Sequence, residues 1–261
     1  MDRLKSIKPL DNLDYIMKAV VLCAGKGTRI REVTEDKIPK PMIEVDGKPI
    51  LEYTIENLEE NGVDEVLINL HHKGEVIEEY FGSSYGDLDI KYFWEDELRG
   101  TAGALSQMKD DLNDSFLTLY GDIITDLDFN EFMSSHNSNE GIGTILTYSG
   151  EENLTEASII DLVESRINDF IEKPSEDQIQ DVKGEIWTNA SVYCFDEEIF
   201  EFIDDEGEQD FGHDIFPQVV DSEYFLSGYR LPKKTYWREI GRPGDYKKLE
   251  EDVLNSRLDW N

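Results

Sequence analysis

The chain has 261 residues, of which 39% are hydrophobic, and its 59 acidic against 25 basic side chains give a formal net charge of −34 at pH 7. This length suffices to bury one substantial α/β core, whereas so negative a chain repels nucleic acid and anionic lipid and argues against both as partners. No charged-then-apolar leader opens the chain and no apolar run approaches the roughly 20 residues of a membrane helix, so we expect a cytoplasmic protein that does not insert into membranes.

The hydrophobic periodicity persists along the chain, so disorder does not account for the charge. We expect instead a carboxylate-coated, halophilic protein of a high-salt cytoplasm, because at about 1 M salt the Debye length is about 3 Å and self-repulsion is screened. Cys23 and Cys194 lie in apolar runs without metal-ligand spacing. We therefore expect both to be buried, as small hydrophobic side chains.

Residues 1–16 form an N-terminal extension to which the sequence assigns no role, and one domain is predicted over 17–261. In its first part, residues 17–140, apolar runs alternate with amphipathic ones at short spacing. Strands are predicted over 18–23, 65–70, 89–94 and 115–120, and helices over 49–61, 74–81 and 101–108. The alternation predicts βαβ units and a Rossmann-like, mostly parallel sheet flanked by helices, with ligands at the carboxyl ends of its strands.

The second part, residues 141–261, is richer in β-strand patterns. Runs at 143–148, 158–163, 166–172 and 188–195 follow one another without intervening helical patterns. They predict an antiparallel or mixed extension that carries a second substrate. The remaining predicted elements are helices over 196–204 and 211–220, strands over 225–231 and 235–240, and a final helix from 243 to about 257.

The few positive charges are unevenly distributed. Residues 26–48 carry six basic and five acidic side chains, whereas residues 121–210 carry 25 acidic side chains and only three basic ones. Local cations on a negative protein point to phosphorylated substrates, which need charged donors. The turn at residues 24–29 (AGKGTR) follows a predicted buried strand, where small residues let backbone N–H groups approach phosphate oxygens. Alone, this turn is equally well explained as a bare glycine loop, since it matches neither the GxGxxG dinucleotide pattern nor the GxxxxGK(S/T) phosphate-binding loop.

Residues 22–58 (LCAGKGTRIREVTEDKIPKPMIEVDGKPILEYTIENL) resemble the signature of the sugar-1-phosphate nucleotidylyltransferase family, which runs AGGxGTRL, PKPM and GKPI. Further family motifs follow in order: GTAGA at 100–104, GD at 121–122, EKP at 172–174, TNA at 188–190 and WxEIGxP at 237–243. The resemblance implies a GT-A-like nucleotidyltransferase fold, with a nucleotide-binding part over 17–140 and a sugar-binding part with a C-terminal helix over 141–261. It also implies an enzyme that joins an NTP to a sugar 1-phosphate and releases pyrophosphate.

The resemblance assigns roles residue by residue. It implies three catalytic cations, Arg29, Lys40 and Lys173. It implies a nucleotide site at Leu22, Ala24, Gly25, Gly27, Thr28, Arg29, Lys40, Gly100 and Thr101. It implies a sugar-phosphate site at Gly121, Glu172, Lys173 and Asn189. It implies Mg²⁺ as the cofactor, held by Asp122 and Glu239, a pairing that suits an ion that takes one or two carboxylates plus substrate phosphates. Most relatives carry Asp where this chain has Glu239, so that ligand is left open.

The base and the sugar are less well defined. Residues 100–104 favour a guanylyltransferase acting on mannose 1-phosphate or a related hexose 1-phosphate. A glucose-1-phosphate uridylyl- or thymidylyltransferase is the alternative. From another class, a non-catalytic subunit that senses nucleotide sugars is disfavoured by the joint presence of Arg29, Lys40, Asp122 and Lys173. Assembly into a homo-oligomer is left open.

Overall fold

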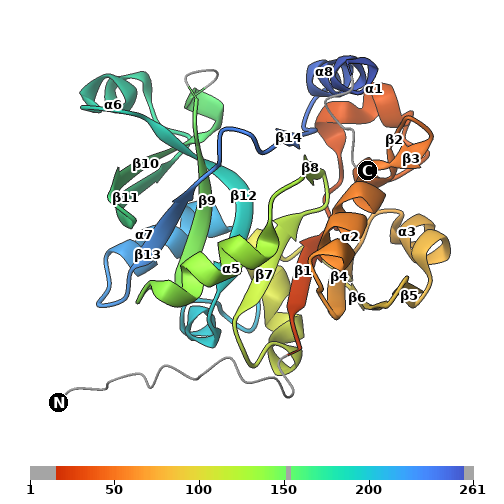
Figure 1. The fold of residues 1–261 in the computed structure, drawn as a ribbon, viewed down its shortest axis with the longest axis horizontal. Helices are drawn as coiled ribbons and strands as arrows, with labels where there is room; N and C mark the ends of the chain where they lie inside the picture. Colours follow the sequence, from red (N-terminus) through yellow and green to blue (C-terminus); the bar gives the residue numbers. More distant parts are fainter. Residues whose placement is uncertain (1–15, 151–153, 256–261) are drawn as a thin grey trace.

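The computed structural model describes residues 16–150 and 154–255, and its central feature is one ten-stranded sheet (Figure 1). The order within the sheet is β10-β11-β13-β9-β12-β7-β1-β4-β6-β5. Four neighbouring strands run parallel: β1 (Lys18–Leu22), β4 (Glu65–Leu70), β6 (Leu88–Trp94) and β7 (Phe116–Tyr120). Since β1, β4 and β7 are covered on both faces, they form continuous apolar runs, and the four predicted strands of the first part are confirmed.

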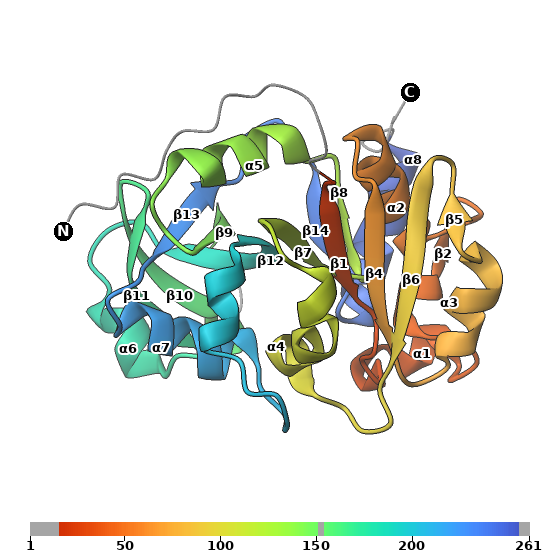
Figure 2. The ribbon, with the colours of Figure 1, turned by 90° about the horizontal axis from the view of Figure 1, so that it is seen from below.

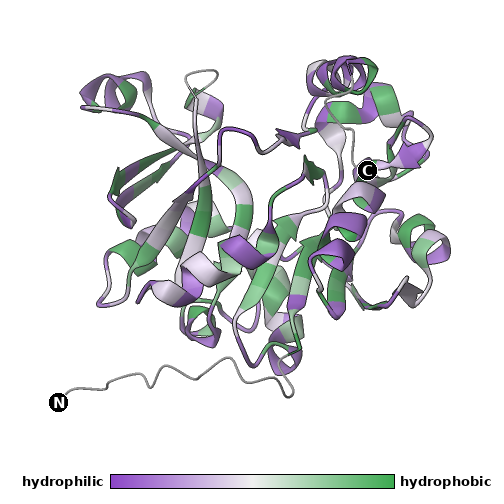
Figure 3. Cartoon of the chain, viewed as in Figure 1, coloured by the Kyte–Doolittle hydropathy of each residue, from purple (hydrophilic) through white to green (hydrophobic). Residues whose placement is uncertain are grey.

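Helices cover both faces of the sheet (Figure 2). Side chains of α2 (Ile50–Glu60), α3 (Gly74–Phe81) and α5 (Phe129–Ser138) pack with Val21 and Ile68 on one face. The alternate strand residues Val20 and Leu67 face the other layer, which contains α4 (Gly100–Gly103), the 3₁₀ segment Ala104–Asp111 and α7 (Phe216–Val220). The predicted α/β class is therefore confirmed. Figure 3 shows hydrophobic residues concentrated in the central strands, while α6 (Glu176–Asp181) and α8 (Pro243–Leu254) are largely hydrophilic.

The β-rich part continues the same sheet. β12 (Trp187–Phe195) pairs antiparallel with β7, and beyond it lie β9 (Gly143–Ser149), β13 (Leu226–Arg230), β11 (Arg166–Glu172) and β10 (Ser158–Val163). The prediction of a mixed extension is confirmed, because β13 and β9 are parallel whereas the other pairs are antiparallel. The expectation of no intervening helix was wrong: α6 separates β11 from β12 and begins with a capping box at Ser175.

Two small sheets complete the fold near the carboxyl end of β7. β2 (Glu44–Val45) and β3 (Lys48–Pro49) form a hairpin, and β8 (Ile123–Thr125) pairs antiparallel with β14 (Trp237–Glu239). This second pairing brings the C-terminal part back beside β7. α8 then packs Leu249 into a small core cluster with Ile30 and Ile124. The final helix ends at Leu254, and the predicted residues 256 and 257 lie outside the described residues, as does most of the extension 1–16.

The described helices also bear on membrane association. None of those in residues 16–150 and 154–255 is long and apolar enough to cross a bilayer.

Candidate active site

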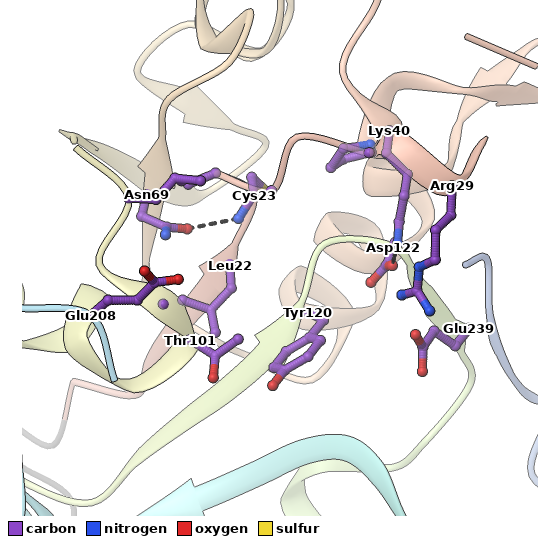
Figure 4. A pocket seen from close by; sticks show the side chains of 16 residues that line it. Leu22, Cys23, Arg29, Lys40, Asn69, Thr101, Tyr120, Asp122, Glu208 and Glu239 are labelled. Atoms are coloured by element: carbon purple, nitrogen blue, oxygen red, sulfur yellow. Dashed lines mark hydrogen bonds and ion pairs between the residues drawn. The ribbon is translucent and has the colours of Figure 1, made fainter. Parts of the chain in front are cut away.

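A pocket of about 280 Å³ opens where β1, β4 and β7 end at their carboxyl ends. Figure 4 shows side chains from several loops converging on it. Ten predicted nucleotide and metal residues line it: Leu22, Ala24, Gly25, Gly27, Arg29, Lys40, Gly100, Thr101, Asp122 and Glu239. Motifs far apart in the sequence thus meet in one place, as expected for loops that follow parallel strands.

The glycine turn after β1 shapes one wall of the pocket. Gly27 has φ 57° and ψ 30°, a left-handed conformation that glycine adopts without cost. A Cβ atom there would lie 3.3 Å from the Cβ of Lys40, so the glycine lets the segment carrying Lys40 pass close by. Pro39 and Pro41 flank this lysine and restrict its backbone, which holds the side chain toward the pocket. Thr28 does not line the pocket and instead begins the short 3₁₀ turn Thr28–Ile30.

Two cations and two carboxylates gather at one end of the pocket (Figure 4). The Nζ of Lys40 forms an ion pair with the carboxylate of Asp122, and their side chains are only 17% and 8% exposed. Burial and the charge of Asp122 raise the pKa of Glu239 to about 7, whereas Lys40 and Arg29 lower it. The four side chains therefore form one electrostatic unit.

Asp122 and Glu239 are held side by side by the backbone. Glu239 lies opposite Ile123 in the β8–β14 pair, and the amide of Ile240 donates to the carbonyl of Asp122 at 2.9 Å. Within residues 16–150 and 154–255 no group of three or more His, Cys, Asp or Glu side chains could hold a metal ion. A pair of carboxylates, of which Asp122 is buried and Glu239 is half-buried, suits Mg²⁺, which completes its coordination with water and substrate phosphates. The longer arm of Glu239 therefore does not remove it from the candidate metal position.

A hydrogen-bonded network that the sequence analysis missed fixes the opposite end. The amide of Cys23 donates to Oδ1 of Asn69 at 2.7 Å, and Nδ2 of Asn69 donates to Oε1 of Glu95 at 2.7 Å. The second oxygen of Glu95 accepts from the amide of Arg99 at 3.0 Å. Asn69 and Glu95 are 3% and 4% exposed, so the loops after β1, β4 and β6 are fixed to one another.

The residues predicted to bind the sugar phosphate lie elsewhere. Glu172 ends β11 and Asn189 belongs to β12, and neither they nor Lys173 line the pocket. Burial raises the pKa of Glu172, while His213 and Lys173 lower it. Lys173 is exposed with φ 48°, and its amide donates to the carbonyl of Ala157 at 2.8 Å. Glu172 and Lys173 are neighbours in the sequence, whereas Asn189 lies on β12, which β13 and β9 separate from β11 in the sheet. All three lie outside the pocket that holds Lys40.

A chain of hydroxyl groups connects the two regions. Nδ2 of Asn189 donates to the hydroxyl of Tyr193 at 2.9 Å. The Tyr193 hydroxyl interacts with that of Tyr120, which also interacts with Thr101, and burial raises the pKa of both tyrosines above the usual range. Tyr120 and Thr101 both line the pocket. One hydroxyl group, that of Tyr193, therefore connects Asn189 to the Tyr120 side chain in the pocket wall.

Gly121 lies beneath the pocket and does not line it. Its amide donates to the carbonyl of Leu22 at 2.9 Å, where β7 runs beside β1. A Cβ atom at this position would lie 2.4 Å from the sulfur of Cys23 and 3.2 Å from the Leu22 carbonyl oxygen. The structure thus explains the glycine by the close approach of two strands. Cys23 and Cys194 are both free and buried, as predicted.

Comparison with known proteins identifies relatives of the whole described chain. A family model described as nucleotidyl transferase matches residues 18–256. The chain is 33% identical over 258 residues to UTP--glucose-1-phosphate uridylyltransferase of Synechocystis sp., covering 93% of this chain and 64% of that protein. It is 33% identical over 246 residues to mannose-1-phosphate guanylyltransferase catalytic subunit beta of Dictyostelium discoideum, covering 92% and 65%. The chain therefore spans slightly less than two thirds of the length of these relatives.

Among solved structures, HddC from Yersinia pseudotuberculosis complexed with GMP-PN superposes with a TM-score of 0.73 at 26% identity, covering 91% of this chain and all of that one. The expected GT-A-like nucleotidyltransferase fold is confirmed by such likenesses.

Proposed function

Because this chain belongs to the nucleotidyl transferase family, we propose that it is an enzyme that transfers a nucleotidyl group from an NTP to a sugar 1-phosphate. A phosphate oxygen of the sugar phosphate attacks the α-phosphorus of the NTP, the bond to the β-phosphate bridging oxygen breaks, and pyrophosphate leaves. The second pKa of a phosphate monoester is about 6, so the nucleophile is already charged at neutral pH and needs no general base. The protein contributes position and charge neutralisation.

The observation that carries this proposal is the meeting of Arg29, Lys40, Asp122 and Glu239 at one end of the pocket. Arg29 and Lys40 would bind the triphosphate and offset the negative charge that develops on the leaving pyrophosphate. Asp122 and Glu239 would hold Mg²⁺, which when bound adds positive charge to the phosphate groups. A regulatory subunit without turnover has no need for both cations beside both carboxylates, so this alternative is disfavoured.

The second substrate would bind at the β-rich part of the sheet. Lys173 is exposed, and no carboxylate of the described residues forms an ion pair with its Nζ, so it is available to a phosphate. Glu172 and Asn189 would contact sugar hydroxyl groups. The hydroxyl groups of Tyr193 and Tyr120 lie between Asn189 and the nucleotide pocket. Residues 17–140 and 141–261 would then serve as the nucleotide-binding and sugar-binding parts of one domain.

For the base and sugar we propose guanylyl transfer to mannose 1-phosphate or a related hexose 1-phosphate. Residues 100–104 support this choice, and so does the likeness to HddC, whose structure was solved with GMP-PN. Uridylyl or thymidylyl transfer to glucose 1-phosphate is the second candidate, because the relative from Synechocystis is a UTP--glucose-1-phosphate uridylyltransferase.

The test is a matrix of four NTPs against glucose, mannose, glucosamine and galactose 1-phosphates, with Mg²⁺ in molar KCl and pyrophosphate release as the measurement. We expect the highest rate with GTP and mannose 1-phosphate, and loss of the rate on addition of EDTA. The control is the Lys40→Met variant. If no combination releases pyrophosphate faster than this variant does, the proposed function is wrong.

A further inference from the structure

A third carboxylate, Glu208, lines the pocket at the end opposite to Asp122 and Glu239. Figure 4 shows it beside Leu22 and Asn69, away from the two cations. A carboxylate in a pocket for a polyanion is repulsive unless it faces a hydrogen-bond donor, since an ionised carboxylate accepts hydrogen bonds and donates none. Metal ions and ionised phosphate groups donate no hydrogen bonds, whereas the base of an NTP carries N–H donors.

The segment that carries Glu208 is fixed to the loop before α4. The carbonyl of Gln209 accepts from the amides of Ala102 and Gly103 at 2.9 and 3.1 Å, and the amide of Gln209 donates to the carbonyl of Arg99 at 2.9 Å. Both the amide and the carbonyl group of Gln209, the residue after Glu208, are therefore hydrogen-bonded to the loop before α4 or to α4 itself. The backbone position of Glu208 is thus set by hydrogen bonds on the adjacent residue.

The next residue strengthens the attachment. Oδ1 of Asp210 accepts from both the amide and the hydroxyl of Thr101, at 3.1 and 3.0 Å. The Thr101 hydroxyl in turn accepts from the amide of Phe211 at 3.0 Å. Thr101 therefore holds the segment and lines the pocket at the same time.

Two glycines explain how the segment can come so close. Gly100 has φ 74°, and a Cβ atom there would lie 2.4 Å from the carbonyl oxygen of Gln209. A Cβ atom at Gly103 would lie 3.0 Å from the carbonyl oxygen of Gly207. Any side chain at either position would push the segment away. The GTAG sequence at residues 100–103 therefore allows the segment that carries Glu208 to pack directly against its backbone.

We propose that Glu208 is a specificity-determining residue that binds the base of the NTP and favours guanine, an inference that rests on the proposed function. Guanine carries two adjacent donors on one edge, N1–H and the N2 amino group, which match the two oxygens of a carboxylate. Uracil and thymine have a single N3–H between two carbonyl oxygens. Cytosine and adenine place a ring nitrogen acceptor beside the amino group. Each of these edges sets an acceptor against Glu208, which disfavours it.

The test compares Glu208→Gln with Glu206→Gln, a matched control in the same segment that removes the same charge but does not line the pocket. We expect Glu208→Gln to lower kcat/KM for GTP by roughly 10- to 100-fold, the scale of a lost charge-assisted hydrogen bond. The kcat/KM for UTP should stay unchanged or rise, because the glutamine amide can donate to a uracil carbonyl. Glu206→Gln should leave the GTP-to-UTP ratio unchanged.

A binding measurement separates this inference from the proposed function. Calorimetric Kd values for GDP and UDP need no turnover, so they can be compared even if no sugar phosphate is a substrate. We expect wild-type protein to bind GDP more tightly than UDP and Glu208→Gln to reduce that ratio at least tenfold. Equal weakening of both nucleotides, an unchanged ratio, or a wild type without a preference for guanine would overturn the assignment. A Tm equal to that of the wild type would show that both variants keep the fold.

Discussion

The close contact beneath the pocket predicts that Gly121→Ala destabilises the protein through one identified neighbour. The new methyl group would lie 2.4 Å from the sulfur of Cys23, so one of the two must move. Overpacking of this kind costs about 1–3 kcal/mol. For a chain of this size each kcal/mol lowers Tm by about 2–4 °C, which gives a decrease of roughly 2–12 °C. As a control, Gly244→Ala meets no atom within 4 Å in α8 and should leave Tm unchanged or slightly higher.

The assignment to Cys23 can be tested by a double-mutant cycle with Cys23→Ala. Burial raises the pKa of the Cys23 thiol, so this change removes a neutral sulfur and no charge. Alone it should cost about 1 kcal/mol for the space it leaves. In the double variant the methyl group introduced by Gly121→Ala occupies part of that space, so the combined loss should fall short of the sum by about 1–2 kcal/mol. Denaturant unfolding in molar KCl measures all four proteins. Additivity within about 0.5 kcal/mol would refute the reasoning.

Three further predictions concern charge. Lys40→Met should lower kcat/KM by roughly 10² to 10³. Its control, Lys48→Met, removes a lysine that pairs with Glu56 outside the pocket and should change kcat/KM less than about 3-fold. Equal effects of the two variants would contradict the placement of Lys40. Asp252→Asn removes the charge of a buried carboxylate that pairs with the half-buried Arg238, and it should reduce the free energy of unfolding by about 2–3 kcal/mol in a denaturant titration. An unchanged midpoint would contradict this expectation. Because the net charge is −34, Tm should rise between 0.1 and 2 M KCl, and a flat curve would count against a halophilic protein.

β1, β4 and β7 could be predicted because burial on both faces gives them continuous apolar sequences. α5 was not predicted, because polar residues interrupt its apolar face, although Asp128 caps it by accepting from the amide of Glu131. β8 could not be predicted either. It has three residues, and its pairing partner β14 is more than a hundred residues away, so no local periodicity identifies it.

In the candidate site, too, residues in local motifs could be predicted, whereas residues placed by contacts between distant segments could not. The motifs identified the residues around Lys40 and Asp122, and the structure brings them together. Asn69 was detectable only as the one polar side chain among the five buried, otherwise apolar positions that follow Glu65 in β4. Glu208 could not be recognised among 59 acidic residues, because its position depends on a contact between residues 100–103 and a distant segment. Motif order also could not show that Lys173 lies outside the pocket, since the strand order of the sheet decides that.

The pairing of β14 with β8 makes the site dependent on late steps of folding. The hydroxyl of Thr125 donates to the carbonyl of Tyr236, 111 residues away in the sequence, and Glu239 follows three residues later. Contacts of such long range close a large loop and form slowly compared with local structure. A nascent chain that has not yet released residues 237–239 from the ribosome therefore lacks Glu239, one of the two carboxylates that we propose as metal ligands. Catalytic activity would then be detectable only after residues 237–239 have been synthesised and β14 has paired with β8.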